Sequence, residues 1–356
     1  MKKVFGVVWR VLVILVAVVV LAAAAFILYL HINEYKPADV ETCEVVDGTA
    51  ATLPKAGQSI RIMTWNIGYA GLDKDADFFM DGGTGVRAES EARVKANLAG
   101  ISATMAQAQA DVYLVQEVDR NSTRTFGIDE TAYLTESGTM SHAFALNYSC
   151  NWVPFPLPML GRIQSGVMTL SSYTMDDAQR IALPCPFGWP LRLANLKRCL
   201  LVSRTPIEGS DKELVLVNLH LEAYDDGAGK EAQTKMLFDF LAAEYQKGNY
   251  VIAGGDFNCV FSSAADAYPI RDGVWTPGSI DESTLPDGFT FHTDDTTPTC
   301  RLLNEPYSTS TDPQFYVIDG FLCSANLSVT AVQTIDAGFT DSDHNPVVLD
   351  VTLSAE

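Results

Sequence analysis

Polar side chains stand at the ends of several apolar runs of the sequence. A carboxylate, an amide or a histidine closes each run or the turn before the next one. These residues are Asn66, Glu117, His220, Asp256, Asn258, Asp319, Asp343 and His344. One such ending is usually a solvated strand terminus. Repeated endings in one chain predict a shared site, because the strand ends of packed α/β sheets gather at one rim.

The types of these residues indicate which chemistry the site could perform. Carboxylate and amide oxygens suit hard cations, so Mg²⁺ or Mn²⁺ is favoured and Ca²⁺ is a further candidate. Zinc sites usually show closer spacing, such as HExxH. A hard cation neutralises charge on a phosphoryl oxygen, and imidazole exchanges protons near neutral pH. Together these groups predict metal-assisted hydrolysis of a phosphate ester.

The surrounding sequence alternates between strand-like and helix-like segments. Helix formers with apolar spacing near 3.6 fill residues 87–110 and 228–248, and apolar strand-like runs flank them. The expected strands cover 60–68, 111–118, 213–223, 249–258, 314–324 and 343–353. This alternation predicts α/β layering in one catalytic domain over 59–356.

The overall charge limits the class of partner. The 356 residues carry a formal net charge of −20. A protein that grips long nucleic acid usually has a basic stripe for the phosphates, and the sequence has none. We therefore expect no stable complex with long nucleic acid, although a nuclease whose cation supplies the positive charge is still allowed. The sequence leaves the oligomeric state open.

The N-terminus has the features of a membrane anchor. Residues 11–30 are uncharged and long enough to cross a bilayer. Lys2, Lys3 and Arg10 precede this run, so the positive-inside rule puts residues 1–10 in the cytoplasm. We expect a single-pass protein of the cell membrane, with a stalk over 31–58 and the catalytic domain outside. A cleaved signal peptide is the alternative.

Seven cysteines are spread over the chain without a CxxC pair. An extracytoplasmic location permits disulfides, but an odd count and the lack of paired spacing favour mostly buried free thiols with at most one bridge.

The motifs together resemble the endonuclease/exonuclease/phosphatase superfamily, which includes deoxyribonuclease I. The resemblance rests on TWN (64–66), QE (116–117), NLH (218–220), GDFN (255–258), ID (318–319) and SDHNPV (342–347). Their order and approximate spacing agree from residue 60 onward. The implied fold is a four-layered αββα sandwich, here preceded by one transmembrane helix.

The resemblance also implies roles on the metal side of the site. Glu117 would be the principal metal ligand, with Asn66 beside it on the ion or the phosphate. Asp343 would bind a metal or tune the neighbouring histidine. Arg198 lies near the place of a phosphate-contacting arginine in deoxyribonuclease-like members.

On the catalytic side, Asp256 and Asn258 would position the attacking water and the scissile phosphate. His344 would be the general base or its equivalent, oriented by Asp319. His220 would be a second histidine that donates to the phosphate or the leaving group. The sequence does not decide which histidine takes which role.

Two segments depart from the family pattern. The insertion 69–85 would lie beside the site, and its acids Asp73, Asp75, Asp77 and Asp81 predict a solvated loop rather than a calcium site. The aromatic segment 144–160 could line a cleft or dip into the outer leaflet, but we expect a loop packed on the sandwich.

Three functions fit these observations. The first is a phosphoesterase that acts outside the membrane on a lipid headgroup or another small phosphate ester. The second is an extracellular nuclease of low sequence specificity, which the histidine pair favours. The third is a surface protein that kept the fold as a non-catalytic binding module.

Overall fold

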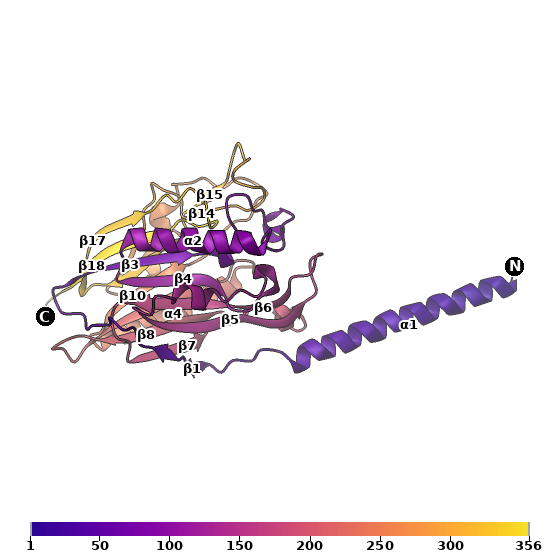
Figure 1. Ribbon diagram of the computed structural model, residues 1–356, viewed down its shortest axis with the longest axis horizontal. Coiled ribbons are helices and arrows are strands. Elements are labelled where there is room, and N and C mark those ends of the chain that lie inside the picture. Colours follow the sequence, from indigo (N-terminus) through magenta and orange to yellow (C-terminus); the bar gives the residue numbers. More distant parts are fainter. Residues whose placement is uncertain (1, 355–356) are drawn as a thin grey trace.

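Two seven-stranded sheets packed face to face form the centre of the protein in a computed structural model, which describes residues 2–354 (Figure 1). In order, the strands of the first sheet are β1 (Val40–Thr42), β7 (Asp177–Ala182), β8 (Cys199–Pro206), β9 (Glu213–His220), β10 (Tyr250–Asp256), β16 (Asp319–Ser324) and β13 (Phe289–His292). Those of the second are β17 (Leu327–Thr334), β18 (Val347–Leu353), β3 (Ser59–Asn66), β4 (Val112–Asp119), β6 (Gly161–Ser171), β5 (Ser141–Val153) and β2 (Val45–Val46).

Helices cover the outer faces of both sheets and complete four layers. Helix α2 (Glu91–Ala108) and the short α3 (Glu130–Leu134) lie on the second sheet, and α4 (Ala228–Gln246) packs on the first. Two small sheets, β11 (Cys259–Phe261) with β12 (Gly278–Ile280) and β14 (Cys300–Arg301) with β15 (Phe315–Tyr316), lie outside the sandwich core. The predicted αββα sandwich is confirmed.

Alternating side chains explain why the layers stack in this way. On β3, Ile60 and Ile62 face the core between the sheets, whereas Met63 and Trp65 face α2. Successive strand side chains point to opposite faces, so strands that are apolar on both faces must be covered on both sides.

Much of the segment predicted as a stalk, residues 31–58, belongs to the folded domain. Residues 40–42 pair with β7, and residues 45–46 pair with β5, so each adds an edge strand to one sheet. Thr52 and Lys55 also bridge to Tyr173 and Glu208. The folded domain therefore begins near residue 40 rather than 59, because this segment satisfies backbone groups at the sheet edges.

Helix α1 (Lys2–Ile32) projects from the domain and is almost wholly exposed along its length (Figure 1). Its apolar stretch, Val4–Ile32, is long enough to cross a membrane, a property that a signal sequence near the N-terminus shares. Its last turns touch the domain: Phe26, Ile27 and Leu30 belong to an apolar cluster with Leu193.

The structure describes all seven cysteines and leaves each as a free thiol, most of them buried. The aromatic segment 144–160 is largely strand rather than loop, since β5 runs to Val153. Tyr148 is packed inside, while Trp152 and Phe155 are exposed. The loop that follows β5, residues 154–160, is mostly exposed, so the expectation of a loop packed on the sandwich is wrong.

Candidate active site

Strand register brings three of the predicted residues into one row of the first sheet. The parallel pairing of β9 with β10 sets His220 beside Asp256, and the antiparallel pairing of β10 with β16 sets Asp256 beside Asp319. Nε2 of His220 lies 3.4 Å from Oδ2 of Asp256. Residues distant in sequence become neighbours because His220 and Asp256 end their strands, and Asp319 begins the antiparallel strand β16, at the same rim.

The second sheet supplies Asn66 and Glu117. Asn66 ends β3 and pairs with Gln116 of β4. Glu117 follows Gln116, at a register shift in β4. Nδ2 of Asn66 lies 3.2 Å from Oε1 of Glu117 and 3.0 Å from Oδ2 of Asp256. Asn66 therefore joins the carboxylates of the two sheets.

A buried amide pair fixes the two sheets against each other below this point. Nε2 of Gln116 donates to Oδ1 of Asn218 at 2.8 Å, and Nδ2 of Asn218 donates to the carbonyls of Val115 and Met168. Both amides belong to the motifs QE and NLH. Their structural role was not predicted, because sequence does not reveal pairing across the sandwich.

The loop before β18 places His344 over this row. Nδ1 of His344 hydrogen-bonds Oδ2 of Asp319 at 2.9 Å. Its Nε2 lies 3.8 Å from Oδ2 of Asp256 and 3.9 Å from Oδ2 of Asp343. The loop is held because the Trp65 indole donates to the His344 carbonyl at 2.8 Å.

The surroundings shift the pKa values of the two histidines in opposite directions. Burial alone would lower the pKa of His344, but the negative charges of Asp319 and Asp343 outweigh it and raise the pKa well above the usual value. Burial, followed by the positive charge of Arg198, holds the pKa of His220 well below its usual value. Pairs of titratable groups pushed apart in this way are typical of acid and base partners.

The carboxylates crowd one another. Burial and the neighbouring Asp319 raise the pKa of Asp256. Burial, with a contribution from Glu117, raises the pKa of Asp343 to about 6. Acids that repel one another in a buried site gain most from a positive ion among them.

The donor set fits a hard cation. Ligand atoms of Asp256, Asp319 and His344 lie within 4.8 Å of one another, as do those of Cys300, Asp343 and His344. Among the described residues, Oδ1 of Asp319 is buried without a hydrogen-bond partner. Burial raises the pKa of the Cys300 thiol to about 12, so it is a poor ligand. The oxygen donors and His344 are thus the better cation ligands.

Asn258 and Arg198 hold the backbone around the site. The Asn258 side chain donates to the Leu221 carbonyl at 2.9 Å, and its backbone N–H donates to Oδ1 of Asp256 at 2.8 Å. Arg198 is 4% exposed, with Nε 3.1 Å from Oε2 of Glu222 and Nη1 donating to the His220 carbonyl. These contacts favour a positioning role for Arg198 over the predicted contact with phosphate.

Residues 69–73 of the insertion are buried and residues 74–85 are half-buried or exposed, so the expectation of a solvated loop is wrong for its first part. Asp73 accepts a hydrogen bond from Asn97, and Asp77 accepts from the backbone of Thr84 and Gly85. Asp81 accepts from the Tyr224 hydroxyl at 2.9 Å. These acids have partners inside the protein, and Asp81 comes near enough to His344 for their charges to interact.

Arg301 anchors the same insertion and was not predicted. It is 1% exposed, and its Nη2 donates to the carbonyls of Asp73 and Ala76. Its backbone N–H donates to the Asp343 carbonyl. No sequence feature near Arg301 could have identified it, since its side-chain partners in the insertion lie more than 200 positions away.

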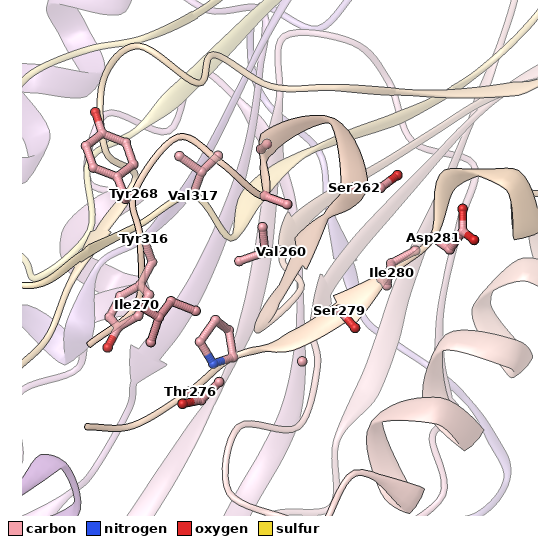
Figure 2. A pocket seen from close by; sticks show the side chains of 14 residues that line it. Val260, Ser262, Tyr268, Ile270, Thr276, Ser279, Ile280, Asp281, Tyr316 and Val317 are labelled. Atoms are coloured by element: carbon pink, nitrogen blue, oxygen red, sulfur yellow. The ribbon is translucent and has the colours of Figure 1, made fainter. Parts of the chain in front are cut away.

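A mainly apolar cavity of about 550 Å³ lies beside β11 and β12 (Figure 2). Val260 and Val317 line it, each two residues from a predicted site residue, Asn258 and Asp319. None of the predicted site residues lines this cavity. It is therefore separate from the polar row.

Comparison with known proteins agrees with this fold and site. The sequence pattern described as the Endonuclease/Exonuclease/phosphatase family matches residues 63–344. The chain belongs to this family. Its members are in general metal-dependent hydrolases of phosphate esters. No curated protein sequence matches the chain.

Solved structures with the same fold are distant in sequence. An endonuclease/exonuclease/phosphatase from Beutenbergia cavernae DSM 12333 has a TM-score of 0.57 at 20% identity, covering 84% of this chain and 72% of that one. The human nocturnin catalytic domain with bound sulfate has a TM-score of 0.51 at 16% identity, covering 88% and 97%. D. rerio TDP2 complexed with a single-strand DNA product has a TM-score of 0.51 at 15% identity, covering 83% and 99%.

Proposed function

We propose that this protein hydrolyses a phosphodiester or phosphomonoester with the help of Mg²⁺ or Mn²⁺, in a domain held outside the cell membrane by α1. The observation that carries the proposal is the convergence on Asp256: Asn66, His220 and His344 approach its carboxylate from three different segments. Apolar side chains would stabilise this part of the protein better than these buried polar groups do, so the arrangement indicates a function other than stability.

The residues take distinct parts in the proposed reaction. Glu117 and Asn66 would hold the cation, with Asp343 close by. When bound, the cation would supply charge neutralisation at the phosphoryl oxygens. Asp256 is placed to orient a water molecule for attack, and Asn258 fixes the backbone on which Asp256 stands.

The histidines would move the protons. With its Nδ1 proton held by Asp319, His344 presents Nε2 to the site and can donate a proton there. Neutral His220 presents Nε2 to Asp256 and can accept one or hydrogen-bond the phosphate. This assignment places the acid at His344, whereas the family resemblance implied a base.

We propose a lipid headgroup or another small phosphate ester as the substrate. The apolar helix, the acidic overall charge and the exposed aromatics at the end of β5 support a substrate at the membrane surface. An extracellular nuclease is the second candidate. The histidine pair and the fold shared with TDP2, whose structure contains a single-strand DNA product, favour it.

An activity screen of the full-length protein in mixed micelles separates these candidates. Sphingomyelin, phosphoinositides and plasmid DNA would each be incubated with Mg²⁺, Mn²⁺ or EDTA. We expect lipid turnover that EDTA abolishes. Plasmid nicking without lipid turnover would establish the nuclease instead.

Variants test the catalytic assignment against a non-catalytic binding module. Glu117→Ala and His344→Ala should lower the rate by about 10²- to 10⁴-fold while the protein stays folded. Lys95→Ala on the exposed face of α2 is the matched control and should keep full activity. Equal activity in all three variants would overturn the site.

Labelling of Cys185 tests the location of the domain. Cys185 is the exposed cysteine of the chain. A membrane-impermeant maleimide should label it on intact cells, and Cys185→Ser should remove the label. Labelling that requires cell lysis would place the domain in the cytoplasm.

A further inference from the structure

A basic pocket of about 320 Å³ opens where α1 joins the domain. Five of its ten lining residues are Lys or Arg, although acids outnumber bases 44 to 24 in the whole chain. These five are Lys36, Arg180, Arg192, Lys197 and Arg198. The concentration of positive charge indicates a site for an anion.

Arg180 gives the pocket a buried donor without a partner. Its side chain is 2% exposed, and its Nε and Nη2 donate to the carbonyls of Leu146 at 2.8 Å and Lys197 at 2.6 Å. Nη1 has no hydrogen-bond partner within residues 2–354. A buried charged donor that lacks a partner is costly, so a ligand that accepts from Nη1 would stabilise the protein.

Glu34 shows which chemistry the pocket accepts. Its carboxylate is buried and lies 3.2 Å from Nε of Arg192, 3.7 Å from Nζ of Lys197 and 3.5 Å from Nζ of Lys36. An anionic oxygen is therefore already held there. Arg198 pairs with Glu222, and Arg180 lies 3.9 Å from Glu41. Glu34 alone faces the other three cations, Lys36, Arg192 and Lys197, so a second anionic group can be accommodated.

The position of the pocket indicates the source of that group. Glu34 follows the last residue of α1, Ile32, by two positions. An apolar rim of exposed side chains lies at the end of β5 with the loop after it, and at the start of the short helix η4 (Leu191–Ala194). Both β5 and η4 contact α1. The rim consists of Trp152, Phe155, Leu157, Trp189 and Leu191. Aromatic and leucine side chains beside cations are typical of surfaces that enter the bilayer interface.

The same surface reaches the candidate active site. The ring of Phe155 lies 6.0 Å from that of Phe79, edge to face. Phe79 begins the short helical turn that ends at Asp81, the partner of Tyr224. A bilayer that covers the rim would thus lie beside the insertion that flanks the polar row.

We propose that the pocket binds the phosphate of an anionic phospholipid in the leaflet at the domain end of α1, while the apolar rim enters the same leaflet. This inference rests on the proposed membrane anchoring by α1 but not on catalysis. The lipid phosphate accepts from Nη1 of Arg180 and pairs with Arg192 and Lys197. Bilayer and domain are then joined at a second point besides α1.

Native mass spectrometry of the full-length protein in detergent tests this proposal. Phosphatidylglycerol, phosphatidylcholine or inorganic phosphate would be titrated, and bound ligand counted. We expect phosphatidylglycerol to bind most tightly. The double variant Arg192→Gln/Lys197→Gln should weaken its binding by roughly 30-fold, since each Lys or Arg near an anionic surface contributes about a five-fold factor. Lys95→Gln/Lys235→Gln, on exposed helix faces, should leave binding unchanged.

Three outcomes would overturn the proposal. They are equal binding of the two lipids, an unchanged affinity in the pocket variant, and binding of inorganic phosphate as tight as that of phosphatidylglycerol. If the double variant does not fold, Arg192→Gln alone serves, because its side chain is 44% exposed. The readout is independent of hydrolysis, so an inactive enzyme would not affect the result.

Discussion

Cation binding should weaken steeply as pH falls, because the ligands must lose protons first. The pKa of Asp343 is raised to about 6, chiefly by burial, and that of Asp256 is raised by burial and Asp319. A proton on Asp343 competes directly with the cation, and a proton on Asp256 removes a neighbouring negative charge that favours cation binding. We therefore expect the affinity for Mg²⁺ or Mn²⁺ to rise with pH until both acids are ionised.

The size of the effect follows from Asp343. With a pKa of about 6, roughly nine-tenths of this acid is ionised at pH 7 and about one-tenth at pH 5. The affinity should therefore fall by about ten-fold between these values from this group alone. The raised pKa of Asp256 adds to the loss.

The stability of the metal-free protein should change in the opposite sense. The folded state keeps a proton on Asp343 that the unfolded chain, with a pKa near 3.8, has released. The free energy of unfolding should then fall as pH rises from about 4 through about 6. Saturating Mg²⁺ should offset this fall, because it stabilises the ionised acids.

Isothermal titration with Mg²⁺ or Mn²⁺ at several pH values between 5 and 8 measures the affinity directly. Asp343→Asn is the informative variant: its binding should be weaker at pH 7 and less dependent on pH. A wild-type affinity that stays constant from pH 5 to 7 would refute the reasoning. So would a variant whose pH dependence equals that of the wild type.

Three further predictions concern other parts of the site. Asp319→Asn should lower kcat by about 10²- to 10⁴-fold and lower the pKa of His344 in the pH–rate profile, because the charge that raises it is gone; an unchanged profile would contradict this. Glu117→Gly should abolish cation binding. It should also raise the free energy of unfolding by about 1 kcal/mol in urea titrations, because Glu117 has a left-handed φ of 54° that glycine adopts without strain. A less stable variant would contradict the inference that the backbone is strained here. Gln116→Leu should cost about 1–3 kcal/mol of stability by leaving Oδ1 of Asn218 without its donor, and a neutral result would show that the amide bridge is dispensable.

The sequence predicted the polar row because strand ends obey a simple rule. Each of these residues closes an apolar run, and neighbouring strands end at one rim in an α/β sheet. The register of β9, β10 and β16 then places His220 next to Asp256, and Asp256 next to Asp319. The layered fold followed from the same alternation of strand and helix, although β5 to β8 were not assigned.

The failures have a common physical origin. Strands of two or three residues, such as β2 and β1, are too short to show a periodic pattern. Burial of the insertion depends on distant partners: Tyr224 lies 143 positions from Asp81. Arg198 was placed from spacing alone, but its partner Glu222 could be found only from the pairing of β8 with β9.

Backbone strain at the site argues that its geometry is fixed by the protein rather than by a ligand. Gly68, Tyr69 and Ala70 form a left-handed turn with φ of 51°, 43° and 47°, separated from Asn66 by Ile67 alone. Glu117 and Asn258 are also left-handed. Each non-glycine residue in this region costs about 1–2 kcal/mol, and such residues persist only where their surroundings hold them.

The surroundings that hold this strain can be identified. The guanidinium carbon of Arg124 lies 3.5 Å from the ring centroid of Tyr69, and the Arg124 side chain is fixed by two hydrogen bonds of 2.9 Å to Asp119. Asp119 ends β4 two residues after Glu117. One buried ion pair thus supports both the strained turn and the strand that carries the principal ligand. Ligands held in this way need little reorganisation when charge develops in the reaction, and that is the condition under which electrostatic catalysis is most effective.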